Sequence, residues 1–131
     1  MSLRVFLVED SAAMRAHLIE ILLTRAGVDI VGIAETEEAA VSWLDRNADG
    51  WDIALVDLFL HEGTGAGVIE HCRQRRPDQS VIVMTNHARD PDLLQHCKLL
   101  GADAVYHKAL DLDGLVAHCI ELASKSVRNT T

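Results

Sequence analysis

Short apolar segments and amphipathic segments of helical period alternate five times along this chain. The apolar segments are too short for typical helices and contain Val or Ile, which predicts strands buried on both faces. In the segments between them, apolar residues recur every three to four positions, as in helices packed on one side. This alternation predicts an α/β doubly wound fold, (βα)5, with a five-stranded parallel sheet covered by helices on both faces. The predicted strands are 4–8, 30–33, 53–56, 81–84 and 104–106.

The boundaries of the helical segments carry capping residues. Ser11 precedes the first helical segment, where its hydroxyl can accept a free backbone N–H, and Gly27 and Gly101 stand where helices end. The chain contains no linker or low-complexity segment, and 131 residues are enough for one well-packed core. We therefore predict one domain over residues 1–126 and a polar, frayed tail over residues 127–131.

Composition excludes several classes of function. The formal net charge is −8 and no Lys/Arg run is present, which argues against direct nucleic-acid binding. No stretch approaches the roughly 20 apolar residues of a membrane span, and no signal peptide is visible. Cys72, Cys97 and Cys119 fall on the apolar faces of predicted helices, which indicates small buried side chains rather than a disulfide or metal set. A reducing cytoplasm fits this cysteine usage.

Polar residues stand at the carboxyl ends of four predicted strands. In open α/β sheets these ends share one edge, where ligands bind. The residues expected to gather there are Glu9, Asp10, Asp57, Thr85 and Lys108.

This set suggests chemistry on a phosphoryl group. Three neighbouring carboxylates repel one another and raise their pKa values, and a divalent cation removes that cost. Oxygen ligands suit Mg²⁺. Asp57 would be the nucleophile that forms an aspartyl phosphate, Lys108 and the metal would neutralise the phosphoryl oxygens, and Thr85 would hydrogen-bond one of them.

With these residues in register, the chain resembles receiver domains of two-component response regulators from Leu3 to about Ser126. That family has an acidic pair after the first strand, Asp after the third, Thr or Ser after the fourth and Lys after the fifth. The resemblance implies a flavodoxin-like fold with strand order 2-1-3-4-5. It also implies a cytoplasmic phosphoacceptor of a phosphorelay, with no enzymatic activity beyond self-catalysed phosphotransfer and autodephosphorylation.

The resemblance assigns roles to individual residues. Asp57 would take the phosphoryl group from a phosphohistidine on a sensor histidine kinase or a phosphotransfer protein. Mg²⁺ would be held by Asp10, Asp57 and the backbone carbonyl of Phe59, with Glu9 acting through water. Phe59 and His87 occupy the positions that tune dephosphorylation. A conformational shift would then carry the signal to a downstream protein, or to a second copy, through the fourth helix, fifth strand and fifth helix.

Four positions depart from the family pattern, among them Asn86, where Ala usually follows the Thr. The usual Pro after the Asp-x-x-Leu motif is His61, and the usual switch aromatic is Val105. The aromatic stands one place later, at Tyr106, which in a strand means the opposite face. The usual Pro after Lys108 is Ala109, so we expect a trans peptide there. These departures keep open an alternative, a pseudo-receiver that binds partners without phosphorylation.

The same residues argue against three other functions. His61, His87 and His107 are expected near the sheet edge that carries the carboxyl ends of the strands. Together with the carboxylates, they could bind Zn²⁺ or Fe²⁺. Their spacing is not that of a ligand set, so solvated loop histidines are favoured. An FMN-binding flavodoxin would need a phosphate loop where the acidic pair stands. A haloacid-dehalogenase-type phosphatase needs a second Asp two residues after Asp57, where Phe59 is found.

Overall fold

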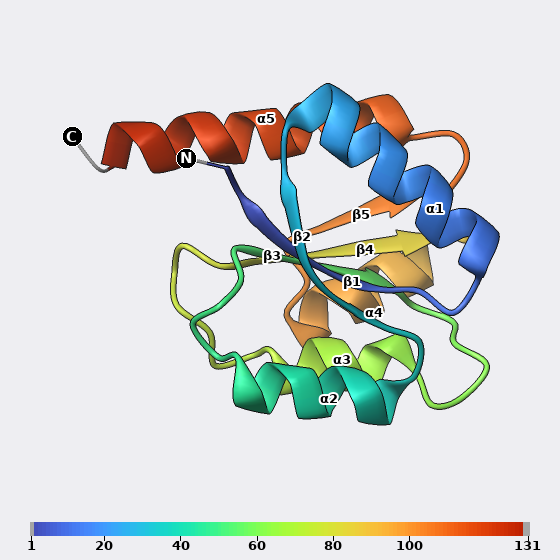
Figure 1. Cartoon of the computed structure of the whole chain (residues 1–131). Coiled ribbons are helices and arrows are strands. Elements are labelled where there is room, and N and C mark those ends of the chain that lie inside the picture. The colour runs from blue at the N-terminus through green and yellow to red at the C-terminus, as the bar shows by residue number, and fades with distance from the viewer. Residues whose placement is uncertain (1, 130–131) are drawn as a thin grey trace.

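The computed structural model describes residues 2–129 and contains one parallel sheet of five strands in the order β2-β1-β3-β4-β5. This confirms the predicted flavodoxin-like doubly wound fold (Figure 1). The observed strands extend the predicted ones by at most one residue at either end. Their bounds are β1 Arg4–Val8, β2 Asp29–Ala34, β3 Ile53–Asp57, β4 Ser80–Thr85 and β5 Ala104–His107.

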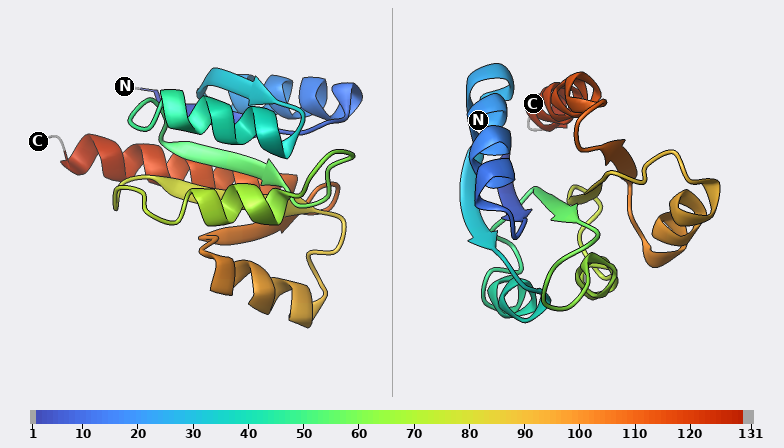
Figure 2. Two further views of the ribbon diagram at one scale, coloured as in Figure 1. Left: turned by 90° about the horizontal axis from the view of Figure 1, so that it is seen from below. Right: turned by 90° about the vertical axis from the view of Figure 1, so that its right-hand side faces the viewer.

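The helices form one layer on each face of the sheet. Helices α1 and α5 cover one face, and α2, α3 and α4 cover the other (Figures 1 and 2). A short π-helical segment, η1, continues α1 to the left-handed Gly27. The bounds are α1 Ala12–Ile21, η1 Leu22–Ala26, α2 Glu37–Arg46, α3 Gly65–His71, α4 Pro91–Leu100 and α5 Leu112–Asn129.

Two hydrophobic cores result, because successive strand residues point to opposite faces. On β1, Val5 and Leu7 pack in the core beneath α1 and α5, whereas Phe6 and Val8 pack in the core beneath α2, α3 and α4. Every residue of β3 is buried, as expected for a central strand covered on both sides. The central position of β3 fixes where its last residue, Asp57, can lie.

The predicted caps and cysteines behave as expected. Ser11 Oγ accepts the backbone N–H of Met14 at 3.3 Å, and Gly101 ends α4 with a left-handed φ of 113°. Cys72, Cys97 and Cys119 are free and buried. Burial raises the pKa of Cys72 and of Cys119 to about 11, so neither thiol is reactive at neutral pH.

Helix α5 crosses the predicted domain end at residue 126, and the frayed tail stays a prediction. Helix α5 runs on to Asn129, into the segment 127–131 that was expected to be a tail. Arg128 and Asn129 are polar, but no Gly or Pro interrupts the helix there. Residues 130–131 lie outside the described part of the chain. Within residues 2–129, no helix is both long and apolar enough to cross a bilayer.

Candidate functional site

Asp57 ends β3 with its carboxylate almost fully enclosed, at 5% exposure. Its Oδ1 accepts the backbone N–H of Phe59 at 3.2 Å, and its Oδ2 accepts a hydrogen bond from Lys108 Nζ at 2.9 Å. Lys108 follows directly after β5, so β4 lies between the two strands whose ends meet here. The sheet thus joins groups that are 51 residues apart in sequence.

Lys108 also contacts the buried carboxylate of Glu9, with 2.7 Å between Nζ and Oε1. Burial raises the pKa of Glu9 above its usual value. Burial by itself would lower the pKa of Lys108, but its close contacts with the carboxylates of Glu9 and Asp57 outweigh it, and the net shift is upward. The ammonium therefore stays charged between two carboxylates. Glu9 Oε2 accepts the N–H of Ser11, but Oε1 has no partner of good hydrogen-bond geometry.

Asp10 is held by the loop that follows β3. Its Oδ2 accepts the backbone N–H of His61 at 2.6 Å and lies 2.5 Å from the imidazole Nδ1 of the same residue. Burial raises the pKa of Asp10, but the backbone hydrogen bond from His61 and further hydrogen bonds outweigh this and lower it overall. The His61 side chain is 87% exposed, so it reaches the carboxylate from the solvent side.

The residues fit a divalent cation. Oxygens of Glu9, Asp10 and Asp57 lie within 4.8 Å of one another, and with Lys108 the four side chains carry a formal charge of −2. The buried, poorly satisfied Oε1 of Glu9 is a further reason for a cation here. An all-oxygen donor set suits Mg²⁺. The carboxylates face a cavity of about 350 Å³, lined by Glu9, Asp10, Ser11, Asp57, Phe59, Leu60, His61, Asn86, His87 and Lys108.

Of the predicted site residues, only Thr85 does not line this cavity. Its side chain is fully buried, and Oγ1 accepts the backbone N–H of His87 at 3.1 Å. Phe59 and His87 both line the cavity, with their rings edge to face at a centroid distance of 5.3 Å. Phe59 is 57% exposed, which leaves an apolar ring beside the acidic groups.

The three histidines do not form a metal set. The Nδ1 atom of His107 accepts hydrogen bonds from the backbone N–H groups of Ala109 and Leu110, at 3.0 and 3.1 Å. The ring therefore stabilises the turn that directly follows His107. Among the described residues, the cluster of potential metal ligands is composed of carboxylates alone. His61 differs from His87 and His107 in that its ring contacts one of these carboxylates.

The expectations for the β5 region hold. Tyr106 packs in the core beneath α5 and its hydroxyl lies 2.7 Å from Nδ1 of His118, whereas Val105 packs on the opposite face. The aromatic ring is thus absent from the face on which the family resemblance would place it. No cis peptide occurs in the described residues, in agreement with the trans peptide expected between Lys108 and Ala109.

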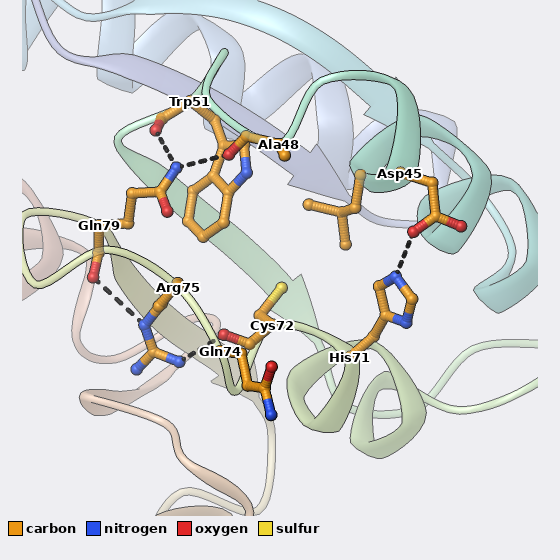
Figure 3. A pocket seen from close by; sticks show the side chains of 9 residues that line it. Asp45, Ala48, Trp51, His71, Cys72, Gln74, Arg75 and Gln79 are labelled. Carbon is orange, nitrogen blue, oxygen red and sulfur yellow. Dashed lines mark hydrogen bonds and ion pairs between the residues drawn. The ribbon is translucent and has the colours of Figure 1, made fainter.

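A second cavity, of about 180 Å³, lies between α2 and α3, away from the strand ends (Figure 3). Several of its polar groups already have partners. The amide of Gln79 donates to the carbonyls of Ala48 and Trp51, both at 3.0 Å, and His71 pairs with Asp45 at 2.8 Å. This cavity offers no unpaired reactive group comparable to the acidic cluster.

Glu37 is a supporting residue that the sequence analysis missed. From the start of α2, its Oε1 accepts the backbone N–H of Thr64 at 2.7 Å, and its own N–H donates to the carbonyl of Glu62 at 3.2 Å. A Cβ at Gly63 or Gly67 would collide with the Glu37 side chain. The two glycines were the available signal, since glycine often marks a close approach of another group.

Replacing Glu37 with alanine is expected to loosen the loop between β3 and α3. Loss of a charge-assisted hydrogen bond to a backbone N–H should cost about 1–2 kcal/mol of unfolding free energy. Amide hydrogen exchange over residues 61–67 should accelerate, and urea unfolding should report the loss. The matched control is Glu38→Ala, an exposed neighbour. Equal exchange rates in both variants would contradict the role of Glu37.

The family model of the response regulator receiver domain matches residues 5–120 of the chain. The chain belongs to this family. Its fold also matches that of a CheY-like receiver domain protein from Methanospirillum hungatei, with a TM-score of 0.79 at 22% identity over 98% of this chain and 99% of the other. The response regulator domain of Thermotoga maritima CheB gives a TM-score of 0.76 at 20% identity, over 92% of each chain.

Curated relatives of this receiver domain are longer proteins. The chain is 31% identical, over 93% of its length, to a protein-glutamate methylesterase/protein-glutamine glutaminase of Xanthomonas oryzae pv. oryzae, of which it spans 34%. It is 30% identical, over 68% of its length, to the response regulator UvrY of Escherichia coli, of which the match covers 40%. The chain therefore corresponds to the receiver part of two-component proteins.

Proposed function

We propose that this receiver domain accepts a phosphoryl group on Asp57 from a phosphohistidine of a sensor histidine kinase or a phosphotransfer protein. The observation that supports this best is the position of the Asp57 carboxylate. It faces the cavity, 2.9 Å from Lys108 Nζ and beside the carboxylates of Glu9 and Asp10. A structural carboxylate at a strand end would not require this arrangement.

The transfer breaks the P–N bond of the donor and forms a P–O bond to a carboxylate oxygen of Asp57. The donor imidazole leaves with the electron pair of the broken bond. Lys108 is placed to neutralise the phosphoryl oxygens, and Thr85 would hydrogen-bond one of them after its hydroxyl turns from the N–H of His87. Mg²⁺ held by Glu9, Asp10, Asp57 and the carbonyl of Phe59 would supply further neutralising charge.

Phe59 and His87 are proposed to tune the lifetime of the aspartyl phosphate. Their rings stand together in the cavity wall, where Phe59 shields the acyl phosphate from water and His87 can orient a water molecule. The two effects have opposite signs. Substituting each residue separately would show which of them controls the rate of hydrolysis.

The proposed output surface is formed by α4, β5 and α5. Leu99 and Ile120 are large apolar side chains left exposed on α4 and α5, at 62% and 46%. They suit a downstream protein or a second copy of the chain. A structural neighbour is the CheX–CheY–BeF3–Mg²⁺ complex of Borrelia burgdorferi, with a TM-score of 0.77 at 20% identity over 92% of this chain and 88% of that chain. It gives a precedent for a protein partner.

We propose a cytoplasmic signalling role without metabolic catalysis. The methylesterase and glutaminase named for the Xanthomonas relative belong to a protein of which this chain spans 34%. The alternative is the pseudo-receiver, which binds partners without phosphorylation and is favoured by the unusual His61, Val105 and Ala109. The two functions differ in whether Asp57 is modified.

The test is the intact mass of the protein after incubation with Mg²⁺ and acetyl phosphate. Wild type should gain one phosphoryl group, and the gain should be absent in Asp57→Asn and after chelation of Mg²⁺. A receiver that accepts only protein donors would gain the group from a phosphohistidine protein instead. If a folded protein gained none from its cognate phosphohistidine donor, the pseudo-receiver would replace our proposal.

A further inference from the structure

We propose that the imidazole of His61 is a metal ligand at this site. It would add one nitrogen to the oxygen donors and shift the preference of the site from Mg²⁺ towards Mn²⁺, Co²⁺ or Zn²⁺. The inference builds on the cation site of the proposed function. It does not depend on whether Asp57 is phosphorylated.

The position of His61 supports this role. Its Nδ1 lies 2.5 Å from Asp10 Oδ2, while its backbone N–H donates to the same oxygen. Neighbouring donors on a metal with bonds of about 2.1 Å are roughly 3 Å apart. His61 lies outside the cluster of carboxylate oxygens within 4.8 Å, so its ring would turn inward from this contact before a cation could bind it together with Asp10. The backbone hydrogen bond would hold the loop in place while the ring, 87% exposed, turns.

The carboxylates provide an independent reason for a cation at this position. Glu9 is 99% buried, and its Oε1 lacks a hydrogen bond of good geometry even though Lys108 Nζ is 2.7 Å away. Glu9, Asp10 and Asp57 bring oxygens within 4.8 Å of one another. The cluster therefore retains excess negative charge after Lys108 is counted.

Nitrogen donors change which metal is preferred. A set composed of oxygens alone suits Mg²⁺, whereas imidazole favours metals later in the series from Mn²⁺ to Zn²⁺. One nitrogen ligand is expected rather than three. The ring of His107 accepts hydrogen bonds from the backbone of the turn that follows it, and the ring of His87 packs against Phe59.

Metal binding to the purified chain, without a phosphodonor, tests this inference. Isothermal titration with Co²⁺ and with Mg²⁺ should be compared for wild type, His61→Ala and His96→Ala. The last is a matched control, because His96 is exposed on α4. We expect His61→Ala to weaken Co²⁺ binding by on the order of tenfold while changing Mg²⁺ binding less than about twofold. His96→Ala should match wild type.

Pulsed EPR of the Mn²⁺-loaded protein gives a second readout. Wild type should show a nitrogen coupling from imidazole, and His61→Ala should not. Equal or tighter Co²⁺ binding by His61→Ala, without nitrogen coupling in wild type, would overturn the inference and leave His61 as a hydrogen-bond partner of Asp10. Asp10→Asn separates the two proposals. If it leaves binding of both metals unchanged, the metals bind elsewhere and the cation site of the proposed function fails as well.

Discussion

Replacing Gly65 with alanine is expected to destabilise the protein by about 3 kcal/mol. A Cβ at this position would overlap the carbonyl oxygen of Asp57 and lie 2.7 Å from Cα of Leu58. Both obstacles are backbone, so no side-chain rotation can relieve them. The N–H of Gly65 also donates to the carbonyl of Leu58 at 2.9 Å, which ties the start of α3 closely to the end of β3.

Urea unfolding measures this effect, and Gly50→Ala is its control. A Cβ at Gly50 would find its nearest neighbours at 3.4 Å, an ordinary contact, so that variant should stay within about 0.5 kcal/mol of wild type. If Gly65→Ala is folded, phosphoryl transfer to Asp57 should also be slower, because the strand end that carries the carboxylate must shift. Gly65→Ala with wild-type stability would show that the β3–α3 loop can move apart at little cost.

Replacing Lys108 with methionine is expected to cost about 3–5 kcal/mol of unfolding free energy near pH 8. The ammonium is buried between Glu9 and Asp57, at 2.7 and 2.9 Å. Methionine preserves much of the apolar stem but leaves two enclosed carboxylates without their cation. Addition of Mg²⁺ should recover part of the lost stability, since the metal supplies positive charge to the same oxygens.

The cost of Lys108→Met should depend on pH. Burial raises the pKa of Glu9 in the folded protein, and removing the ammonium of Lys108, which lowers it, raises it further. A carboxyl group with a raised folded-state pKa favours folding below its unfolded pKa, and this is lost as pH rises through the folded value. The difference in unfolding free energy from wild type should therefore be larger at pH 8 than at pH 5. Urea unfolding at both pH values measures it.

Lys98→Met is the control for this prediction, because Lys98 is exposed on α4 and should show no comparable cost or pH dependence. A pH-independent loss in Lys108→Met would mean that packing of the lysine stem, rather than charge, explains its contribution. A loss below about 1 kcal/mol would mean that water replaces the ammonium without penalty.

The strands, and the edge at which their polar ends meet, could be predicted from the amino-acid pattern alone. The spacing of apolar residues along the chain distinguishes strands from helices, and parallel strands place their carboxyl ends at one edge of the sheet. Glu9, Asp57 and Lys108 could therefore be grouped before any contact was known. The period of two along a strand also placed Tyr106 and Val105 on opposite faces. These are properties of repeating backbone geometry.

The contacts between side chains at the ends of the strands, by contrast, depend on how the whole chain folds. Folding brings His61 onto Asp10, turns Thr85 towards the N–H of His87, and places Glu37 against the loop after β3. Loop paths and rotamers have no sequence period. They depend on packing and hydrogen bonds between segments far apart in the chain, so the sequence could indicate which residues gather at the site but not how they pair.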